Sequence, residues 1–593
     1  MRILSLLLVL VLLTGCSAAP VATVSTEETI APAQNVEAIH VVETAEIPYV
    51  SRFNSVTEIQ LSDNSITVNG GAETDNVYTS NDIVYYEDKD AYESGNPYGE
   101  GEAHQRHSVE EAAAHTVVNI TAPGAYRVSG KLSAGQIRVD LGDDAYYEAD
   151  AVVELILSDT DITCTVAPAI LFLNTYECDG NWSTETAKAE VDTVSAGASL
   201  ILEGNNTITG SHVAKIFKDK DGEKKLWKQD GAVYSYMSLN VYGPGALQLT
   251  ADNEGLDTEL HLTINGGNIT ILSDNDGINT NEDGVSVTTI NAGNLTIHAG
   301  LGAEGDGIDS NGYLVINGGT VISAAKPMAD AGLDSDLGSY INGGTVVAMG
   351  STMDWAESES QQVTMNLSFA QRQKEDSKIA ITQEDGTEIF TFDTGSEYGR
   401  GFSGLILSSP ALKRGETYHV YIDGVQMAYT GTDVGGFPGG FGGGFGGRPG
   451  NMGEMPEGFE PGQMPEGFEG FGGQMPEDFD PSKMEGFPGG GKMPEGFDPS
   501  QMGGGRGQRP EGMEMPEGMQ RPEGFGKERP EGMERGEMPE GFEPGQMPEG
   551  FEGFGGQMPG GFGGRGEESG GEASTSFYMN DMVNAFSGVK EAT

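Results

Sequence analysis

Residues 252–349 repeat the same two phrases four times, and this repetition limits the possible folds more than any other feature. The first phrase is usually an acidic residue, then Gly, an aliphatic residue and Asp or Asn; it covers Glu254–Asp257, Asp276–Asn279, Asp306–Asp309 and Ala331–Asp334. The second phrase, Ile-Asn followed by Gly-Gly or Ala-Gly, carries Asn265, Asn291, Asn317 and Asn342, which are 26, 26 and 25 residues apart. A fixed period of this length indicates stacked supersecondary units.

The residues between the glycines indicate which unit is repeated. Leu262-Thr263-Ile264 and Leu295-Thr296-Ile297 are short alternations rich in β-branched residues, closed by Asn-Gly or Gly-Gly turns. Such segments are too short and too rich in glycine for helices. About 25 residues per repeat without a helical pattern favours a parallel β-helix over a leucine-rich or WD-type repeat. We therefore predict an all-β chain with a parallel β-helix, or β-solenoid, over residues 58–350.

Period-2 alternation predicts a ladder of polar residues on the outside of this fold. If the aliphatic residue of each first phrase points inward, the next residue points outward, and this holds for Asp257, Asn279, Asp309 and Asp334. Two residues further on, the same face carries Glu259, Asn281, Asn311 and Asp336. In the preceding repeat Val233 takes the place of Asp257, so we expect the ladder to begin at Asp257.

Stacked carboxylates need a neutralising partner. Unit charges about 5 Å apart repel by about 3 kcal/mol at an effective dielectric constant of 20. A calcium ion lies about 2.3–2.6 Å from its oxygen ligands, so ligands on neighbouring strands can hold one between them. The ladder therefore predicts a calcium-binding edge. The alternative is that Asp and Asn only form turns, since both tolerate left-handed backbone and bond to their own backbone; this explains Asn265, Asn291, Asn317 and Asn342 best.

The N-terminus predicts secretion and lipidation. Met1 to Cys16 has one early positive charge, an apolar run and the sequence Leu-Thr-Gly-Cys. An apolar run this short is typical of a signal peptide rather than a spanning helix. Leu-Thr-Gly-Cys resembles a bacterial lipobox, which implies cleavage before Cys16 and a lipid anchor on its sulfur at the cell surface. Residues 17–57 are predicted to be a tether. Cys164 and Cys178 either pair outside the cytoplasm or remain free.

The period fails after Met349, and two further regions follow. Strict alternation from Val363 to Phe369 and a hairpin signal at Asp385-Gly386 predict a small antiparallel β unit over residues 351–432 that caps the repeats. From residue 433 to 593 Gly, Pro, Met, Phe and Glu dominate, and Met455–Pro476 returns letter for letter as Met538–Pro559. This composition cannot bury enough apolar surface to fold, so it predicts a long disordered tail.

Several of these segments resemble a known family. Gly124–Gly130, Gly135–Asp140, the repeated Asp-Gly-Ile-Asp and Ile-Asn-Gly-Gly phrases and Ser408–Tyr418 are similar to bacterial surface proteins with a carbohydrate-binding domain. The resemblance covers roughly residues 58–430. It implies a right-handed, pectate-lyase-like parallel β-helix that holds calcium and binds acidic plant polysaccharides such as polygalacturonate, and cellulose. It also implies that the calcium neighbours are Asp257, Asp276, Asn279, Asp306, Asp309 and Asp334, whereas Ala331 departs from the acidic position.

Charge narrows the choice of function. The chain carries 91 acidic and 32 basic residues, a net charge of −59, which argues against nucleic acid as a partner. A lyase needs a base beside its calcium, and between Lys228 and Arg372 the one lysine or arginine is Lys326, so no cation is expected on the ladder. We therefore expect a non-catalytic, calcium-dependent binder of acidic plant or cell-wall polysaccharide. A pectate-lyase-like enzyme, a two-carboxylate hydrolase and a structural adhesin without a glycan ligand are the alternatives.

Overall fold

The computed structural model describes residues 47–88, 101–181, 183–220, 223–327, 330–351, 354–395, 401–432 and 573–592, with the backbone alone for residues 215–220 and 223–227. All of them belong to one compact unit, formed from residues 1–441 and 565–593. The predicted signal peptide with Cys16, most of the predicted tether and residues 433–572 lie outside the described residues. None of the described helices is long and apolar enough to cross a membrane.

One sheet of nine strands carries the first phrase of each repeat. In spatial order its strands are β23 (Asp334–Ser335), β20 (Ile308–Ser310), β18 (Ile278–Thr280), β16 (Glu254–Thr258), β13 (Gly231–Ser235), β8 (Ile170–Asn174), β6 (Gly135–Asp140), β4 (Thr116–Ile120) and β3 (Val77–Ser80). Neighbouring strands are parallel except for β3 and β4. Leu256 faces Ile278 and Ile278 faces Ile308, so successive repeats stack in register.

The second sheet contains a closed ring of strands, and this overturns the predicted architecture. The ring consists of β7 (Val153–Thr163), β9 (Ala198–Glu203), β14 (Leu239–Tyr242), β17 (Leu262–Ser273), β15 (Ala246–Ala251) and β10 (Asn205–Gly210). Each pairs in parallel with the next, and β10 pairs with β7. The predicted right-handed parallel β-helix is therefore wrong: the chain is all-β, but this sheet forms a closed six-stranded parallel barrel with further strands outside it.

The ring closes because β7 and β17 are long strands. The first part of each strand pairs with one ring strand and the last part with another: β7 with β9 and β10, and β17 with β14 and β15. We expected Asn265-Gly266 to be a turn that separates two short strands. Instead β17 continues through it, pairing with β14 before this point and with β15 after it. A register shift at Asn265 marks a bulge, and Gly267, at φ 98°, supplies a backbone geometry that favours glycine. A bulge bends a strand without ending its pairing, so the residues predicted to form a turn lie within one continuous strand.

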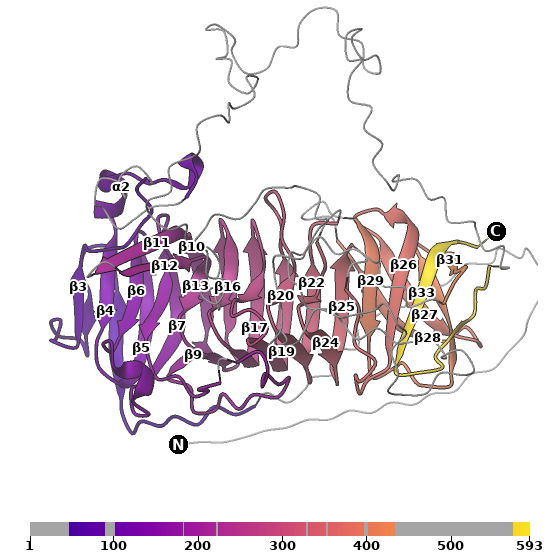
Figure 1. Ribbon diagram of the computed structural model, residues 1–593, viewed down its shortest axis with the longest axis horizontal. Helices are drawn as coiled ribbons and strands as arrows, with labels where there is room; N and C mark the ends of the chain where they lie inside the picture. Colours follow the sequence, from indigo (N-terminus) through magenta and orange to yellow (C-terminus); the bar gives the residue numbers. More distant parts are fainter. Residues whose placement is uncertain are drawn as a thin grey trace, which may run out of the picture. The chain divides into compact units, whose positions relative to one another are not determined.

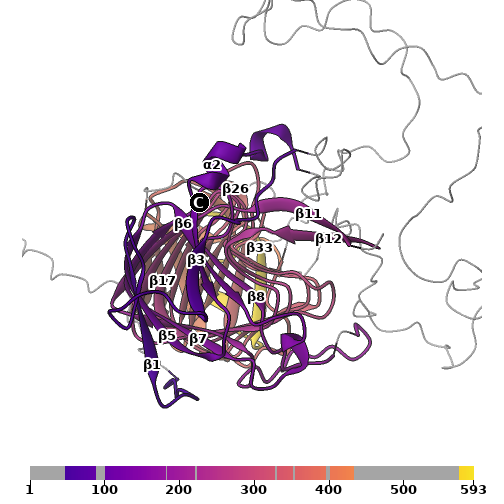
Figure 2. The same ribbon diagram turned by 90° about the vertical axis from the view of Figure 1, so that its left-hand side faces the viewer.

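Other strands extend this sheet beyond the ring. They are β1 (Val56–Leu61), β2 (Thr67–Val68), β5 (Gly124–Leu132), β19 (Val287–His298), β21 (Tyr313–Ile316), β22 (Thr320–Ala324), β24 (Gly338–Ile341) and β25 (Thr345–Gly350). A separate hairpin, β11 (Val213–Lys220) and β12 (Glu223–Gln229), stands out from the body near α2 (Figures 1 and 2). The short helices are η1 (Ala103–Gln105), α2 (Val109–Ala113) and η2 (Ala145–Tyr147).

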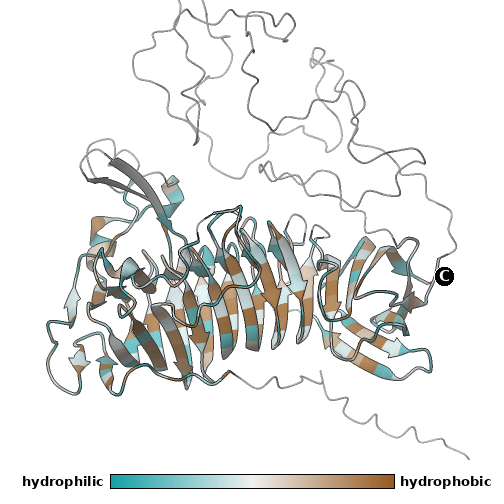
Figure 3. Cartoon of the chain, turned by 60° about the horizontal axis from the view of Figure 1, so that its bottom comes forward, coloured by the Kyte–Doolittle hydropathy of each residue, from teal (hydrophilic) through white to brown (hydrophobic). Residues whose placement is uncertain are grey.

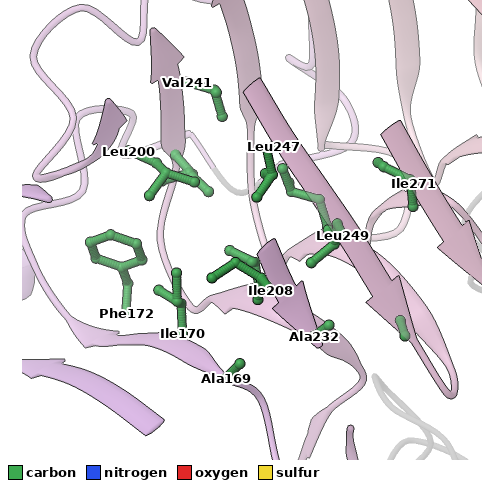
Figure 4. Packing of buried hydrophobic residues seen from close by; sticks show 14 of the residues in the cluster. Ala169, Ile170, Phe172, Leu200, Ile208, Ala232, Val241, Leu247, Leu249 and Ile271 are labelled. Carbon is green, nitrogen blue, oxygen red and sulfur yellow. The ribbon is translucent and has the colours of Figure 1, made fainter. Parts of the chain in front are cut away.

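Aliphatic side chains from both sheets fill the interior. Ile170 and Phe172 of β8 lie close to Leu200, Ile208 and other buried residues in one continuous cluster (Figure 4). Hydrophobic and polar residues alternate along many strands (Figure 3), as expected for strands with one buried face. The inward-pointing aliphatic residues of the repeats, Leu256, Ile278, Ile308 and Leu333, are completely buried. Cys164 and Cys178 are both free, so the two are not joined.

The end of the predicted tether belongs to the folded body. Tyr49, Phe53 and Val56 pack against a small apolar cluster on the outside of the second sheet, which includes Ile156 and Tyr242. The backbone amide of Ile47 donates to the carbonyl of Asn265 at 3.1 Å. The order of residues 47–57 therefore moves the tether's boundary toward the N-terminus.

The region after residue 351 is a group of mainly antiparallel strands with its own apolar cluster. Its strands are β26 (Thr364–Gln373), β27 (Lys378–Gln383), β28 (Glu388–Asp393), β29 (Phe402–Ser408), β30 (Thr417–Ile422), β31 (Val425–Ala428), β32 (Phe577–Tyr578) and β33 (Val583–Glu591). In Figure 1 the yellow β33 lies among the orange strands, and it pairs in parallel with β26.

The predicted disordered tail over residues 433–593 is wrong for its end. Phe577, Phe586 and Val589 are buried in the apolar cluster of this region, which explains why residues 573–592 fold. Bridges join Tyr429 to Ser574 and Gly431 to Ser587. The chain therefore leaves and re-enters the fold at the same place, and residues 433–572 are an insertion rather than a terminus.

Candidate functional site

A row of polar side chains crosses the nine-stranded sheet on the face opposite its aliphatic core. The pairing register aligns Asp257 with Asn279, Asn279 with Asp309, and Asp309 with Asp334. This alignment, expected from the repeats, is confirmed. We use the name acidic ladder for the row and the acidic and amide residues beside it, namely Asp230, Glu254, Asp257, Glu259, Asp276, Asn279, Asn281, Asp306, Asp309, Asp334 and Asp336.

The start of the row differs from the prediction. Tyr234, not Val233, aligns with Asp257, because Gly231 pairs with Glu254 and the register is offset by one residue from the Asp-Gly phrase. Val233 instead aligns with Leu256 in the core. The Tyr234 hydroxyl donates a hydrogen bond to the Glu259 carboxylate. The first repeat therefore contributes a hydrogen-bond donor to the row.

Carboxylates from the position before each glycine join the row. Oxygen atoms of Asp230, Glu254 and Asp257 lie within 4.8 Å of one another. Further along, the backbone amide of Asp306 donates to Asp276 Oδ1 at 2.7 Å, and the amide of Ala331 donates to Asp306 Oδ1. The predicted site residues thus share one face; the outermost, Asp336, is exposed.

Burial and mutual repulsion disfavour the charged form of these carboxyls. Burial, reinforced by Asp230, raises the pKa of Glu254 to about 7. Burial, reinforced by Asp334, raises the pKa of Asp306 to about 8 and that of Asp309 to about 7. Burial is also the main cause of a raised pKa in Asp257, Asp276 and Glu259. The carboxyls of this face that are buried beside one another are therefore harder to ionise than free carboxyls.

Three buried oxygen atoms of the ladder have no hydrogen-bond donor. They are Glu254 Oε2, Asp257 Oδ2 and Asn279 Oδ1. A buried acceptor without a partner costs about 1–3 kcal/mol, so such atoms require an explanation. Carboxylate and amide oxygens are the ligands that calcium takes. The residues present therefore fit calcium ions, with Asp257, Asp276, Asn279, Asp306, Asp309 and Asp334 as the residues that would hold them.

A lysine reaches the ladder, which the sequence analysis missed. Lys228 Nζ lies 2.6 Å from Asp230 Oδ2 and 3.2 Å from Asn281 Oδ1. Asn281 Nδ2 in turn donates to Asp257 Oδ1 at 2.7 Å. Lys228 lies in β12, two residues before Asp230, so period-2 alternation was the signal that could have found it. Lys326, the cation considered from sequence, instead donates to the carbonyl of Gly302.

The asparagines of the second phrase form a ladder of their own. Nδ2 of Asn291 donates to Oδ1 of Asn265 at 2.9 Å, Asn317 to Asn291 at 2.9 Å, and Asn342 to Asn317 at 3.0 Å. We call these four residues the amide ladder. A groove of about 670 Å³ runs beside it and is also lined by Thr263, Thr289, Val315 and residues 189–194. The asparagines are therefore more than turn formers.

Comparisons with known proteins match this chain to proteins described as containing a carbohydrate-binding domain. Residues 114–388 match a family model described as a carbohydrate-binding domain-containing protein. A protein of that description from Acetivibrio thermocellus is 31% identical over 155 residues, which are 26% of this chain and 44% of the relative. The chain therefore spans less than half of that relative's length.

One solved structure also shows a likeness. The gadolinium derivative of a polysaccharide lyase-like protein from C. thermocellum is 20% identical, and the match covers 49% of this chain and 93% of that one. Its TM-score is 0.28, which is too low to bear on the fold or the function of this chain.

Proposed function

We propose that this protein binds an acidic polysaccharide, such as polygalacturonate, through calcium ions held on the acidic ladder. The carbohydrate-binding description of the family model and of the A. thermocellus relative supports the ligand class. The observation that carries the calcium is the set of buried, unbonded oxygens on Glu254, Asp257 and Asn279. In the ionised form these oxygens accept but cannot donate, and a cation is a partner that would satisfy them.

Calcium would also reconcile an acidic surface with an acidic ligand. A polyuronate is repelled by bare carboxylates. A calcium ion takes six to eight oxygen ligands, so an ion held by Asp306, Asp309 and Asp334 has positions left for a sugar carboxylate. The repeats place such positions one above another along the stack, which suits a polymer that carries a carboxylate on successive sugars.

Catalysis is less well supported than binding. A lyase requires an unprotonated base beside the sugar. Burial by itself lowers the pKa of Lys228, but Asp230, Glu254 and Asp257 outweigh it and hold that pKa above its ordinary value. Lys228 therefore stays protonated and is a poor base, so we propose a non-catalytic binder. Secretion and lipid anchoring through Cys16 complete the proposal.

The test is an affinity gel of the full chain in polygalacturonate, run with calcium and again with EDTA, beside a gel that contains a neutral polysaccharide. Retardation by polygalacturonate with calcium, lost with EDTA, supports the proposal. Full retardation in EDTA would remove calcium from it. No retardation in either gel would favour an adhesin without a glycan ligand. Ultraviolet absorbance from unsaturated sugar products in the same mixture would show a lyase.

A further inference from the structure

The end of the acidic ladder next to the β11–β12 hairpin contains a positive charge. Lys228 Nζ contacts Asp230 Oδ2 and Asn281 Oδ1, and Asn281 Nδ2 donates a hydrogen bond to Asp257 Oδ1. The ammonium group therefore pairs directly with Asp230 and is linked to Asp257 through Asn281. Of three hydrogens on Nζ, two have these partners.

The carboxylates around this lysine form a compact group. Oxygens of Asp230, Glu254 and Asp257 lie within 4.8 Å of one another, so one calcium ion about 2.3–2.6 Å from each oxygen fits the span that they enclose. Glu254 is 4% exposed and Asp257 is 0% exposed. Each keeps one oxygen without a hydrogen bond, Glu254 Oε2 and Asp257 Oδ2. Lys228 therefore leaves these two oxygens unsatisfied.

The far end of the ladder has no comparable ion pair among the side chains that the structure describes. Among the ion pairs of the described residues, none involves Asp276, Asp306, Asp309 or Asp334. Their contacts within the ladder include backbone amides, as at Asp276 and Asp306. The two ends therefore differ among the described residues: one has an ion pair with Lys228, and the other has no ion pair.

We propose that Lys228 is the resident cation of the first position of the ladder. Its ammonium group is paired with Asp230, which a divalent cation between Asp230, Glu254 and Asp257 would need as a ligand. Calcium therefore binds only at the later positions, beginning where Glu254, Asp257 and Asn279 keep unbonded oxygens. Lys228 thereby determines how many ions the ladder holds and where the first one lies. Calcium binding at the later positions rests on the proposed function, whereas the role of Lys228 does not.

The test is to count calcium ions per chain by equilibrium dialysis with metal analysis, using the full chain and Lys228→Met. Methionine keeps an unbranched side chain but removes the charge. The expected result is one additional ion in Lys228→Met. Lys228→Arg keeps a cation and should bind the same number as the unchanged protein. Lys228→Met combined with Asp257→Asn removes a ligand of the opened position and should lose the additional ion.

The outcomes separate this inference from the proposed function. If the unchanged protein binds no calcium and Lys228→Met binds one ion, the role of Lys228 stands and the calcium-dependent binding fails. If both bind the same number, the inference is overturned. Should Lys228→Met unfold without calcium, its melting temperature is measured against calcium concentration. A rise much larger than in the unchanged protein supports the inference, and a failure to fold even in calcium overturns it.

Discussion

The acidic ladder and the amide ladder come from the same four repeats, yet only one of them is complete by itself. An amide group both donates and accepts, so Asn291 bonds to Asn265 on one side and to Asn317 on the other. A carboxylate only accepts, so a stack of carboxylates leaves oxygens such as Asp257 Oδ2 without a partner. Identical stacking therefore gives a continuous row of hydrogen bonds with asparagine and leaves unsatisfied oxygens with the acidic residues.

The largest expected effect is the loss of calcium from the acidic ladder. Asp306→Asn combined with Asp309→Asn removes two ligands and should weaken calcium binding by at least tenfold, measured by calorimetry. In EDTA the same variant should melt at a higher temperature than the unchanged protein, because two repelling carboxyls are gone.

The matched control removes two charges elsewhere. Asp143 and Asp144 are exposed and lie outside the ladder, so Asp143→Asn with Asp144→Asn should change neither calcium affinity nor melting temperature appreciably. Equal calcium affinity in the two double variants would show that the ladder is not the site.

A second prediction concerns pH. The folded-state pKa values of Glu254, Asp306 and Asp309 lie near 7 to 8, above their unfolded values near 4. A raised folded pKa means that the stability from the protonated form is fully present below about pH 4 and is lost as pH rises through 8. Without calcium, the contribution of these groups should therefore lower the melting temperature between pH 5 and 8.

Calcium should reverse this trend. Under the proposed function calcium would bind the ionised carboxylates, so the rise in melting temperature on adding calcium should be larger at pH 8 than at pH 5. Calorimetric scans of the full chain at both pH values, each with calcium and with EDTA, measure this difference. A calcium effect that is equal at both pH values would contradict ligation by these groups.

A third prediction concerns the amide ladder, in which one asparagine is replaced by aspartate. Asn291→Asp keeps the acceptor for Asn317 but removes the donor to Asn265 and places two oxygens in contact. The free energy of unfolding should fall by about 1–3 kcal/mol, measured by urea denaturation. Asn64→Asp, at an exposed turn, is the control and should have little effect.

The smallest effect is expected where the acidic row already contains a donor. Tyr234→Phe removes the hydroxyl that bonds to Glu259 and should lower the free energy of unfolding by about 0.5–1.5 kcal/mol. Calcium affinity should change little, because Tyr234 is not among the proposed ligands. A loss of calcium binding as large as in the Asp306 and Asp309 variant would move the site toward the first repeat.

Part of the acidic ladder was predictable from sequence because its determinants are local. The Asp-Gly phrases and period-2 alternation were enough to place Asp257, Asn279, Asp309 and Asp334 in one row. Lys228 was missed because it lies in β12, outside the repeats that predicted the ladder. Asn265 and its equivalents were read as turn residues because the bond from one asparagine to the next exists only after the repeats stack.

The sequence by itself determined the all-β character, the period and the register of the repeats, because strand alternation and turn glycines act over a few residues. Only the tertiary structure decided that β17 runs on through the Asn265 bulge and closes a barrel, because pairing on both sides of a bulge depends on strands distant in the chain. The same holds for residues 573–592. Their apolar side chains fold only because β26 and β31, more than 140 residues away, offer an edge and a core.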